Sequence, residues 1–275
     1  MQNLPRRTPS ARSSTPWTFI CAASRRADPK KKVPETDAIF DELQRKREEA
    51  QGSDGTLRIS MDAKATVLIG LLSREGKARI RVRAYDHDFQ PEETVTPYGI
   101  YLPDHDEVHL FFLSGPVTSD CIVDCLQKMW YEIRHRFPAV DTLLIHQDCG
   151  PQNSSRRTQF MKRMTEFVDL FQLTASLAYY PPYHSKYNPV ERVWGVLEQH
   201  WNGTLIDSVD TAIRCAETMT WNGHHPQVRR IEETYETGVR LTPKEMRVLE
   251  KRFERLPGLE KYFVNITPQP QAKVA

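Results

Sequence analysis

Residues 142–146, Thr-Leu-Leu-Ile-His, form a continuous apolar run that is typical of a strand buried in the middle of a sheet. Residues 57–62 alternate instead, with Leu57, Ile59 and Met61 on one face and Asp62 on the other, which also indicates a strand. A strand that is apolar on both faces needs helices above and below it. These two segments therefore predict a helix-covered sheet.

The remaining periodicities predict the elements around these strands. We expect further strands at 66–70, 78–84, 99–102, 108–113 and 173–178, and helices at 36–50, 119–136, 155–170, 188–201, 208–222 and 242–255. Thr36 and Ser119 are the expected N-caps of the first two helices. The strands between 57 and 84 should form an antiparallel meander, with a turn at 73–76.

A meander followed by alternating helices and strands matches a mixed α/β sheet flanked by helices, as in ribonuclease-H-like domains, with additional C-terminal helices. In such a sheet the first strand is central, and the strand after the first crossover helix pairs beside it. Asp62 and Asp148 should then approach each other despite their separation in the sequence.

The charged residues are distributed unevenly along the chain of 275 residues. Residues 1–34 carry eight basic residues and one acid, although the net charge of the whole chain is only +2. We expect a disordered basic arm at 1–34, one catalytic domain at 35–266 and a frayed tail at 267–275. The arm could neutralise DNA phosphates or be a solvated linker, and composition does not separate the two.

The cysteines and the apolar runs constrain the cellular compartment. Five scattered cysteines do not form a disulfide or zinc pattern, and Cys121 and Cys125 share a helix face as small buried side chains. No apolar run is long enough to span a membrane. We therefore expect a cytoplasmic, nucleoid-associated protein with no membrane partner.

Three acids occupy positions where the predicted elements could bring them together: Asp62, Asp148 after the buried strand, and Glu191 in the first turn of a helix after Asn188-Pro189. Each also has an ordinary interpretation, as a turn acid, a helix cap and a favourable helix-dipole charge, respectively. Together they could hold two Mg²⁺ or Mn²⁺ ions for phosphodiester chemistry.

Several residues near these acids are candidates for contacting DNA. They are Lys64, Asn153, Arg156, Arg157, His184, Lys186 and Arg192. Asn153 could instead cap a helix, and the basic run that continues to Lys162 and Arg163 could be a solvated helix face. Tyr179, Tyr180 and Tyr183 could stack on bases or simply pack, and Trp194 and Trp201 are expected in the core.

Long literal strings make the chain resemble the DDE transposases of bacterial insertion sequences, and most closely the ISAzo13 family. The strings include residues 34–40, 60–67, 86–89, 91–97, 148–153, 180–194, 201–203 and 256–261. The resemblance implies a ribonuclease-H-like fold, divalent metal ions, cut-and-join chemistry on element ends, and catalytic roles for Asp62, Asp148 and Glu191.

The sequence departs from this family at two places. The family usually has Asp-Asn-Gly where this chain has Asp148-Cys149-Gly150, so a hydrogen bond from an amide at position 149 is lost. The family also has a helix-turn-helix region at the N-terminus, whereas about 34 residues, eight of them basic, precede the resemblance here. A truncated copy or a frameshifted copy would both fit this difference.

Three functions fit these observations. The first is a transposase that cleaves DNA at element ends and joins the freed 3′-hydroxyl to target DNA, acting as a homo-oligomer on double-stranded DNA. The second is an inactive fragment that binds DNA or a full-length partner. The third is a ribonuclease-H-like nuclease.

Overall fold

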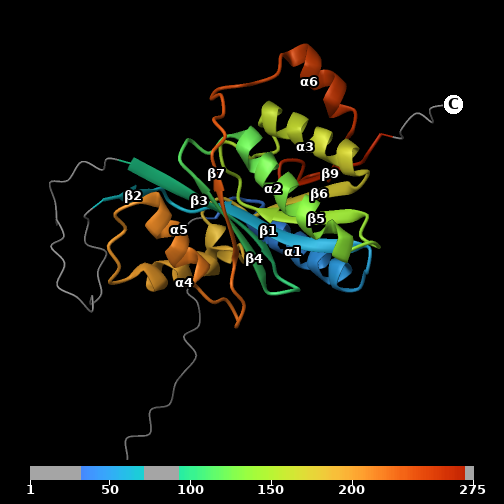
Figure 1. The fold of residues 1–275 in the computed structure, drawn as a ribbon. Helices are drawn as coiled ribbons and strands as arrows, with labels where there is room; N and C mark the ends of the chain where they lie inside the picture. Colours follow the sequence, from blue (N-terminus) through green and yellow to red (C-terminus); the bar gives the residue numbers. More distant parts are fainter. Residues whose placement is uncertain (1–31, 71–92, 270–275) are drawn as a thin grey trace, which may run out of the picture. The chain divides into compact units, whose positions relative to one another are not determined.

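The computed structural model describes residues 32–70 and 93–269, and a mixed sheet lies at its centre (Figure 1). Strand β1 (Thr56–Ala63) lies between β3 (Glu93–Leu102), with which it is antiparallel, and β5 (Thr142–Gln147), with which it is parallel. The prediction of a central first strand beside the buried apolar strand is confirmed. The register aligns Asp62 with Gly99 and Met61 with Gln147.

The other strands extend the sheet in both directions, in the order β7-β4-β3-β1-β5-β6-β9-β8, and β2 pairs with β3. These strands are β2 (Val67–Ile69), β4 (Glu107–Leu113), β6 (Thr174–Tyr179), β7 (Gln227–Ile231), β8 (Phe253–Arg255) and β9 (Phe263–Ile266). Strands β4-β3-β1-β5-β6 form the ribonuclease-H-like arrangement that the sequence predicted.

Helices cover both faces of this sheet (Figure 1). On one side lie α2 (Ser119–Ile133) and α3 (Thr158–Phe171), and on the other lie α4 (Glu191–Trp201) and α5 (Val209–Glu217). Helix α1 (Thr36–Gln51) shares a pocket with the start of α4, and α6 (Pro243–Glu250) follows β7. Short 3-10 helices lie at Arg134–Arg136 and Ser185–Tyr187.

The alternation within β1 separates the two faces of the sheet chemically. Ile59 and Met61 are fully buried in the larger apolar core, which also contains residues of α2 and α3. The second core joins α4 and α5 to the other face of β3 and β4, and includes Trp194 and Trp201. Asp62 therefore lies on the face that α4 covers.

Three predictions about the N-terminal half were wrong. Strand β2 pairs with β3 rather than with β1, so the first part of the predicted meander does not form. Thr36 is the first residue of α1 and its hydroxyl accepts from the Val33 N–H at 2.9 Å, outside the helix. Thr118, not Ser119, caps α2. The predicted turn at 73–76 and strand at 78–84 lie outside the described residues.

The C-terminal third differs more from the prediction. The helix predicted at 242–255 ends at Glu250, and residues 253–255 form β8 against β9. Strands β7 and β9 were not predicted, because they are short and gain their stability by pairing with β4 and β6, which are distant in the sequence. Helices α3, α4 and α5 are each shorter than expected.

Candidate active site

Three elements carry Asp62, Asp148 and Glu191 to one edge of the sheet. Asp62 is the penultimate residue of β1, Asp148 follows the last residue of β5, and Glu191 is the first residue of α4. Because β1 and β5 are parallel neighbours, their C-terminal ends meet at the same edge. All three acids are partly exposed, so a ligand can reach them.

The charges of these three acids interact. Burial raises the pKa of Asp62 to about 8, and repulsion from the carboxylates of Asp148 and Glu191 adds to this effect, as does a hydrogen bond with Glu191. The opposing contribution is one hydrogen bond of 2.8 Å from the Ala63 N–H to Asp62 Oδ1. The three carboxyl groups therefore form a cluster with little positive charge to balance it.

Asn153 holds Asp148 in place. Its amide nitrogen lies 3.3 Å from Asp148 Oδ1, 3.1 Å from the Asp148 carbonyl oxygen and 3.1 Å from Gln147 Oε1. Asn153 is 6% exposed and does not cap α3, so the capping interpretation was wrong. Asp148 thus has an amide donor from Asn153, while Cys149 is exposed.

A buried hydrogen-bond network fixes the start of α4 against β1. The Ser60 hydroxyl donates to Asn188 Oδ1 at 2.5 Å and accepts from the Val190 N–H at 2.9 Å. The Asn188 amide also donates to the Met61 carbonyl oxygen at 3.0 Å. These contacts involve the residues directly before Asp62 and Glu191, so they set where the two carboxylates meet.

Gly99 lets α4 lie this close to the sheet. A Cβ atom at Gly99, the residue opposite Asp62, would lie 2.6 Å from Trp194 Cη2 and 3.0 Å from Val190 Cγ2. Contacts this short do not occur in folded proteins, so only glycine fits under the indole ring. The approach of Glu191 to Asp62 depends on the absence of this one carbon atom.

The donor chemistry of the cluster suits a divalent metal ion. Carboxylate oxygens are the ligands that Mg²⁺ and Mn²⁺ prefer, and the mutual repulsion at Asp62 is relieved when a cation binds. Within residues 32–70 and 93–269, no three His, Cys, Asp or Glu side chains already have the geometry of a metal site. The carboxylates are therefore close enough to repel one another but are not arranged as a closed ligand shell.

Two residues predicted to contact DNA are already engaged within the protein. The Lys64 side chain is 9% exposed, forms an ion pair with Glu198 and lies over the Trp201 ring at 5.9 Å. His184 is fully buried, donates from Nδ1 to the Pro182 carbonyl oxygen at 2.7 Å, and packs against Phe40. Neither side chain is accessible to a phosphate in this conformation, so direct DNA contact by Lys64 and His184 is not supported.

Other basic candidates remain accessible. Arg156, Lys186 and Arg192 are exposed, and Arg157 is partly buried with its Nε atom lacking a hydrogen-bond partner among the described residues. Arg192 follows Glu191 directly, and Lys186 lies in the turn that leads into α4. Lys186 and Arg192 therefore give the solvent side of the start of α4 a positive charge.

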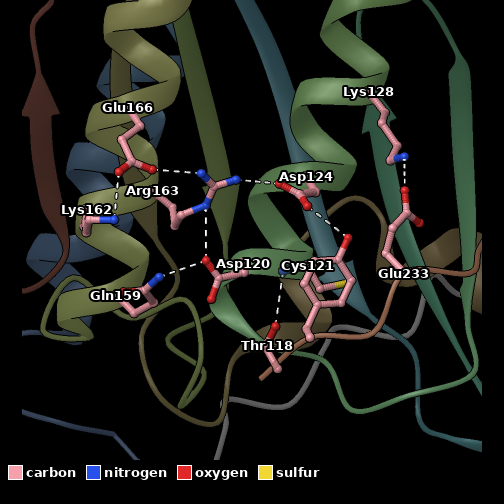
Figure 2. A network of polar contacts seen from close by, with 11 residues as sticks. Thr118, Asp120, Cys121, Asp124, Lys128, Gln159, Lys162, Arg163, Glu166 and Glu233 are labelled. Atoms are coloured by element: carbon pink, nitrogen blue, oxygen red, sulfur yellow. Dashed lines mark hydrogen bonds and ion pairs between the residues drawn. The ribbon is translucent and has the colours of Figure 1, made fainter. Parts of the chain in front are cut away.

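The basic run does not continue toward the site. Figure 2 shows Arg163 of α3 between Glu166 and the acids of α2, where it lies 2.5 Å from Asp124 and 3.2 Å from Asp120. Lys162 pairs with Glu166 at 2.8 Å. Arg163 is paired with acids of α2 and Lys162 with an acid of its own helix, which favours the interpretation of this part of the run as a helix face over a stripe directed at DNA.

The tyrosines and tryptophans considered in the sequence differ in how far they are buried. Tyr179 and Tyr180 are buried, as are Trp194 and Trp201, and the same holds for Cys121 and Cys125. Tyr183 is 69% exposed and adopts a φ of 67°, in the left-handed region that a bulky residue seldom occupies. Of the three tyrosines considered for stacking, only Tyr183 presents its ring to solvent.

Sequence reasoning missed the residues that position the acids. Ser60, Gly99 and Asn188 carry no charge, and their roles arise from contacts across 30 or more residues of sequence. Asn188-Pro189 was noted only as a helix start. The available signal was a small residue opposite a candidate acid, but it acquires meaning only when the strand register is known.

A model of a protein family matches residues 17–268, and its description is "Rhodopirellula transposase DDE domain". The match covers nearly the whole chain and begins within the basic N-terminal stretch. No curated protein matches the sequence significantly.

Solved structures similar to this chain include complexes of the Mos1 transposase. The paired-end complex with the left transposon end has a TM-score of 0.45 and 10% identity, and covers 70% of this chain and 58% of that chain. The Mos1 mariner paired-end complex with Mn has a TM-score of 0.46, 8% identity, and coverages of 71% and 57%. The chain thus spans less than three fifths of the Mos1 chains it resembles.

No helix among the described residues is long and apolar enough to cross a membrane.

Proposed function

The chain belongs to the ISAzo13-type family of DDE transposases, and on this basis we propose that Asp62, Asp148 and Glu191 are its catalytic acids. The observation that carries the proposal is the charge interaction that joins all three carboxylates at the edge of the sheet. They are also the acids that the family resemblance assigns to catalysis.

DDE transposases use divalent metal ions. We propose that this chain takes two Mg²⁺ or Mn²⁺ ions, held by Asp62, Asp148 and Glu191. When bound, such ions neutralise charge on the attacking and leaving oxygens of a phosphodiester. The protein's own contribution is to hold the carboxylates in register, through Asn153 at Asp148 and through Ser60 and Asn188 at the start of α4.

The proposed reaction is cleavage of one DNA strand at an element end, followed by attack of the freed 3′-hydroxyl on target DNA. Cleavage consumes one water molecule and converts a phosphodiester into a 3′-hydroxyl and a 5′-phosphate. Joining exchanges one phosphodiester bond for another and releases a 3′-hydroxyl from the target strand. Neither step forms a covalent bond to the protein. Arg156, Lys186 and Arg192 would contact the DNA backbone, because all three are exposed and each lies close in sequence to one of the proposed catalytic acids. Asn153 would position Asp148 rather than contact phosphate.

The substrate is double-stranded DNA, as element ends and as target. Assembly as a homo-oligomer on DNA and a cytoplasmic, nucleoid-associated location complete the proposal. Nothing in the described residues favours an inactive fragment or a ribonuclease-H-like nuclease over this function.

The test compares Asp148→Asn with Asp54→Asn, an exposed acid before β1 that makes none of the contacts described here. The assay follows Mn²⁺-dependent nicking of a plasmid carrying the ends of the chain's own element. The nicking rate of Asp148→Asn should be lower than that of the wild type by more than about a hundredfold, because metal stabilisation of the transition state is worth several kcal/mol. Asp54→Asn should retain the wild-type rate. Undiminished nicking by Asp148→Asn would refute the assignment.

A further inference from the structure

A pocket of about 440 Å³ lies between α1 and the start of α4. Its volume falls within the range of roughly 300–1,000 Å³ of pockets that bury a small organic molecule. Phe40, Tyr101, Tyr180 and Tyr187 supply aromatic rings to its wall. The pocket is therefore suited to a flat ring rather than to an ion alone.

The charge of the pocket is positive. Arg47 from α1 and Arg192 from α4 are exposed at its rim, and Arg58 from β1 lines it as well. None of the described residues that line it is acidic; the nearest acid contact is Asp104, which pairs with Arg58 at 2.6 Å. An anionic group at the mouth would thus meet two arginines.

Buried polar groups at the pocket lack hydrogen-bond partners. His146 is 4% exposed and Arg58 is 6% exposed, and both line the pocket. Within residues 32–70 and 93–269, the two ring nitrogens of His146 have no hydrogen-bond partner, and the Nε atom of Arg58 has none either. Leaving such groups unpaired costs about 1–3 kcal/mol each, which a ligand that pairs with them would recover.

The hydrogen-bond donor and acceptor that His146 offers distinguish between possible ligands. His146 is buried with both ring nitrogens unpartnered among the described residues, and a neutral imidazole offers one donor and one acceptor. A phosphate supplies acceptors only and would leave the imidazole acceptor unmatched. The edge of a nucleobase carries both donors and acceptors.

We propose that this pocket binds one unpaired nucleotide of the DNA substrate, with its base among the tyrosines against His146 and Arg58 and its phosphate between Arg47 and Arg192. This inference rests on the proposed function, since it takes DNA as the ligand. It adds a base-binding site that the catalytic cluster does not contain.

The location fits a nucleotide beside the reacting phosphodiester. Arg58 and Asp62 both belong to β1, and Arg192 follows Glu191 in α4. Ser60 lies between Arg58 and Asp62 along β1, and its buried hydrogen bond with Asn188 joins β1 to the segment before α4. A strand whose phosphate reaches the carboxylates could place the next nucleotide in this pocket.

The test measures binding of the full chain to duplex DNA with a short single-stranded overhang. One probe has an intact overhang, and a second has an abasic site at the nucleotide next to the duplex. Wild-type protein should bind the abasic probe roughly tenfold more weakly, from lost stacking and base hydrogen bonds. Arg47→Gln and His146→Phe should weaken binding of the intact probe about fivefold or more and reduce the difference between the probes.

Arg45→Gln is the matched control, because Arg45 is an exposed residue of α1 that pairs with Glu42 and Glu49 instead of lining the pocket. Equal binding of the two probes by wild type, or equal effects of Arg45→Gln and Arg47→Gln, would overturn the proposal. Arg47 is exposed, so its replacement tests the pocket even where His146→Phe fails to fold.

The plasmid-nicking assay run in parallel separates this inference from the proposed function. Nicking without discrimination between the probes refutes the pocket alone. Discrimination without nicking supports the nucleotide site and refutes the catalytic assignment.

Discussion

Replacing Gly99 by alanine should displace Glu191 from Asp62. The added Cβ would lie 2.6 Å from Trp194 Cη2 and 2.8 Å from Cζ2, whereas ordinary contacts begin at 3.4 Å. Because Trp194 is only 6% exposed, its ring cannot swing into solvent. Helix α4 must therefore move away from the sheet by about 0.8 Å, which is the difference between an ordinary contact of 3.4 Å and the 2.6 Å to Trp194 Cη2.

Two effects of different size should follow. Overpacking of this kind costs about 1–3 kcal/mol of unfolding free energy. A displacement approaching 1 Å at a catalytic group can cost about a hundredfold in rate. We therefore expect Gly99→Ala to reduce nicking roughly ten- to a hundredfold while the protein remains folded.

The measurements are urea unfolding, followed by circular dichroism, and Mn²⁺-dependent nicking of the plasmid. Gly195→Ala is the matched control, since Gly195 lies in the same helix and an added Cβ there meets nothing within 4 Å. It should keep full activity and gain up to about 1 kcal/mol from helix propensity. Adding Trp194→Phe to Gly99→Ala removes the clashing atoms and should restore part of the rate.

Wild-type activity and stability in Gly99→Ala would refute this reasoning. So would a loss of activity that Trp194→Phe leaves unchanged, because the effect would then not arise from the contact between these two residues.

Three further predictions concern residues elsewhere in the domain. Asn153→Ala should lower nicking about tenfold or more and weaken Mn²⁺ binding measured by calorimetry, because Asp148 loses its amide donor; unchanged affinity and rate would contradict this. The pKa of His146 is lowered to about 3 in the folded state, so only the unfolded state takes up its proton below the usual value of 6.5, and this residue alone should cost about 2 kcal/mol of stability between pH 7 and pH 5. The raised pKa of Asp62 acts in the opposite direction over the same window, so the measured quantity is the difference between wild type and His146→Leu in urea unfolding at both pH values. The stability of wild type relative to His146→Leu should fall by about 2 kcal/mol from pH 7 to pH 5, and a constant difference would contradict this. Arg163→Gln should cost about 1–2 kcal/mol in urea unfolding by breaking the contacts of α3 with Asp120 and Asp124, whereas Lys162→Gln should cost less than about 0.5 kcal/mol; equal costs would show that the contacts between the helices add nothing.

Local pattern was sufficient to predict the centre of the fold. Strands β1 and β5 and helices α1, α2 and α3 follow from side-chain periods within a single segment, and these periods survive folding because each element buries one face or both. The neighbourhood of Asp62 and Asp148 followed from topology, since parallel strands bring their C-terminal ends together. The cap of α2 was misassigned because Thr118 and Ser119 are adjacent hydroxyl residues, and the Thr36 hydroxyl accepts from Val33 before the helix, so only geometry selects the cap.

The sequence by itself determined which residue types are present and which strands and helices they favour, including an acid at the end of each of two neighbouring strands. Only the tertiary structure decided what each side chain faces. It placed Lys64 against Glu198, buried His184, paired Arg163 with α2, and set Trp194 on Gly99. The reason is physical: periodicity reports burial along one segment, whereas hydrogen bonds, ion pairs and close contacts depend on the segment packed against it. Glu191 approaches Asp62 because Gly99 lets α4 pack close to the sheet and because the Ser60–Asn188 hydrogen bond fixes the start of α4. No local sequence pattern records these contacts.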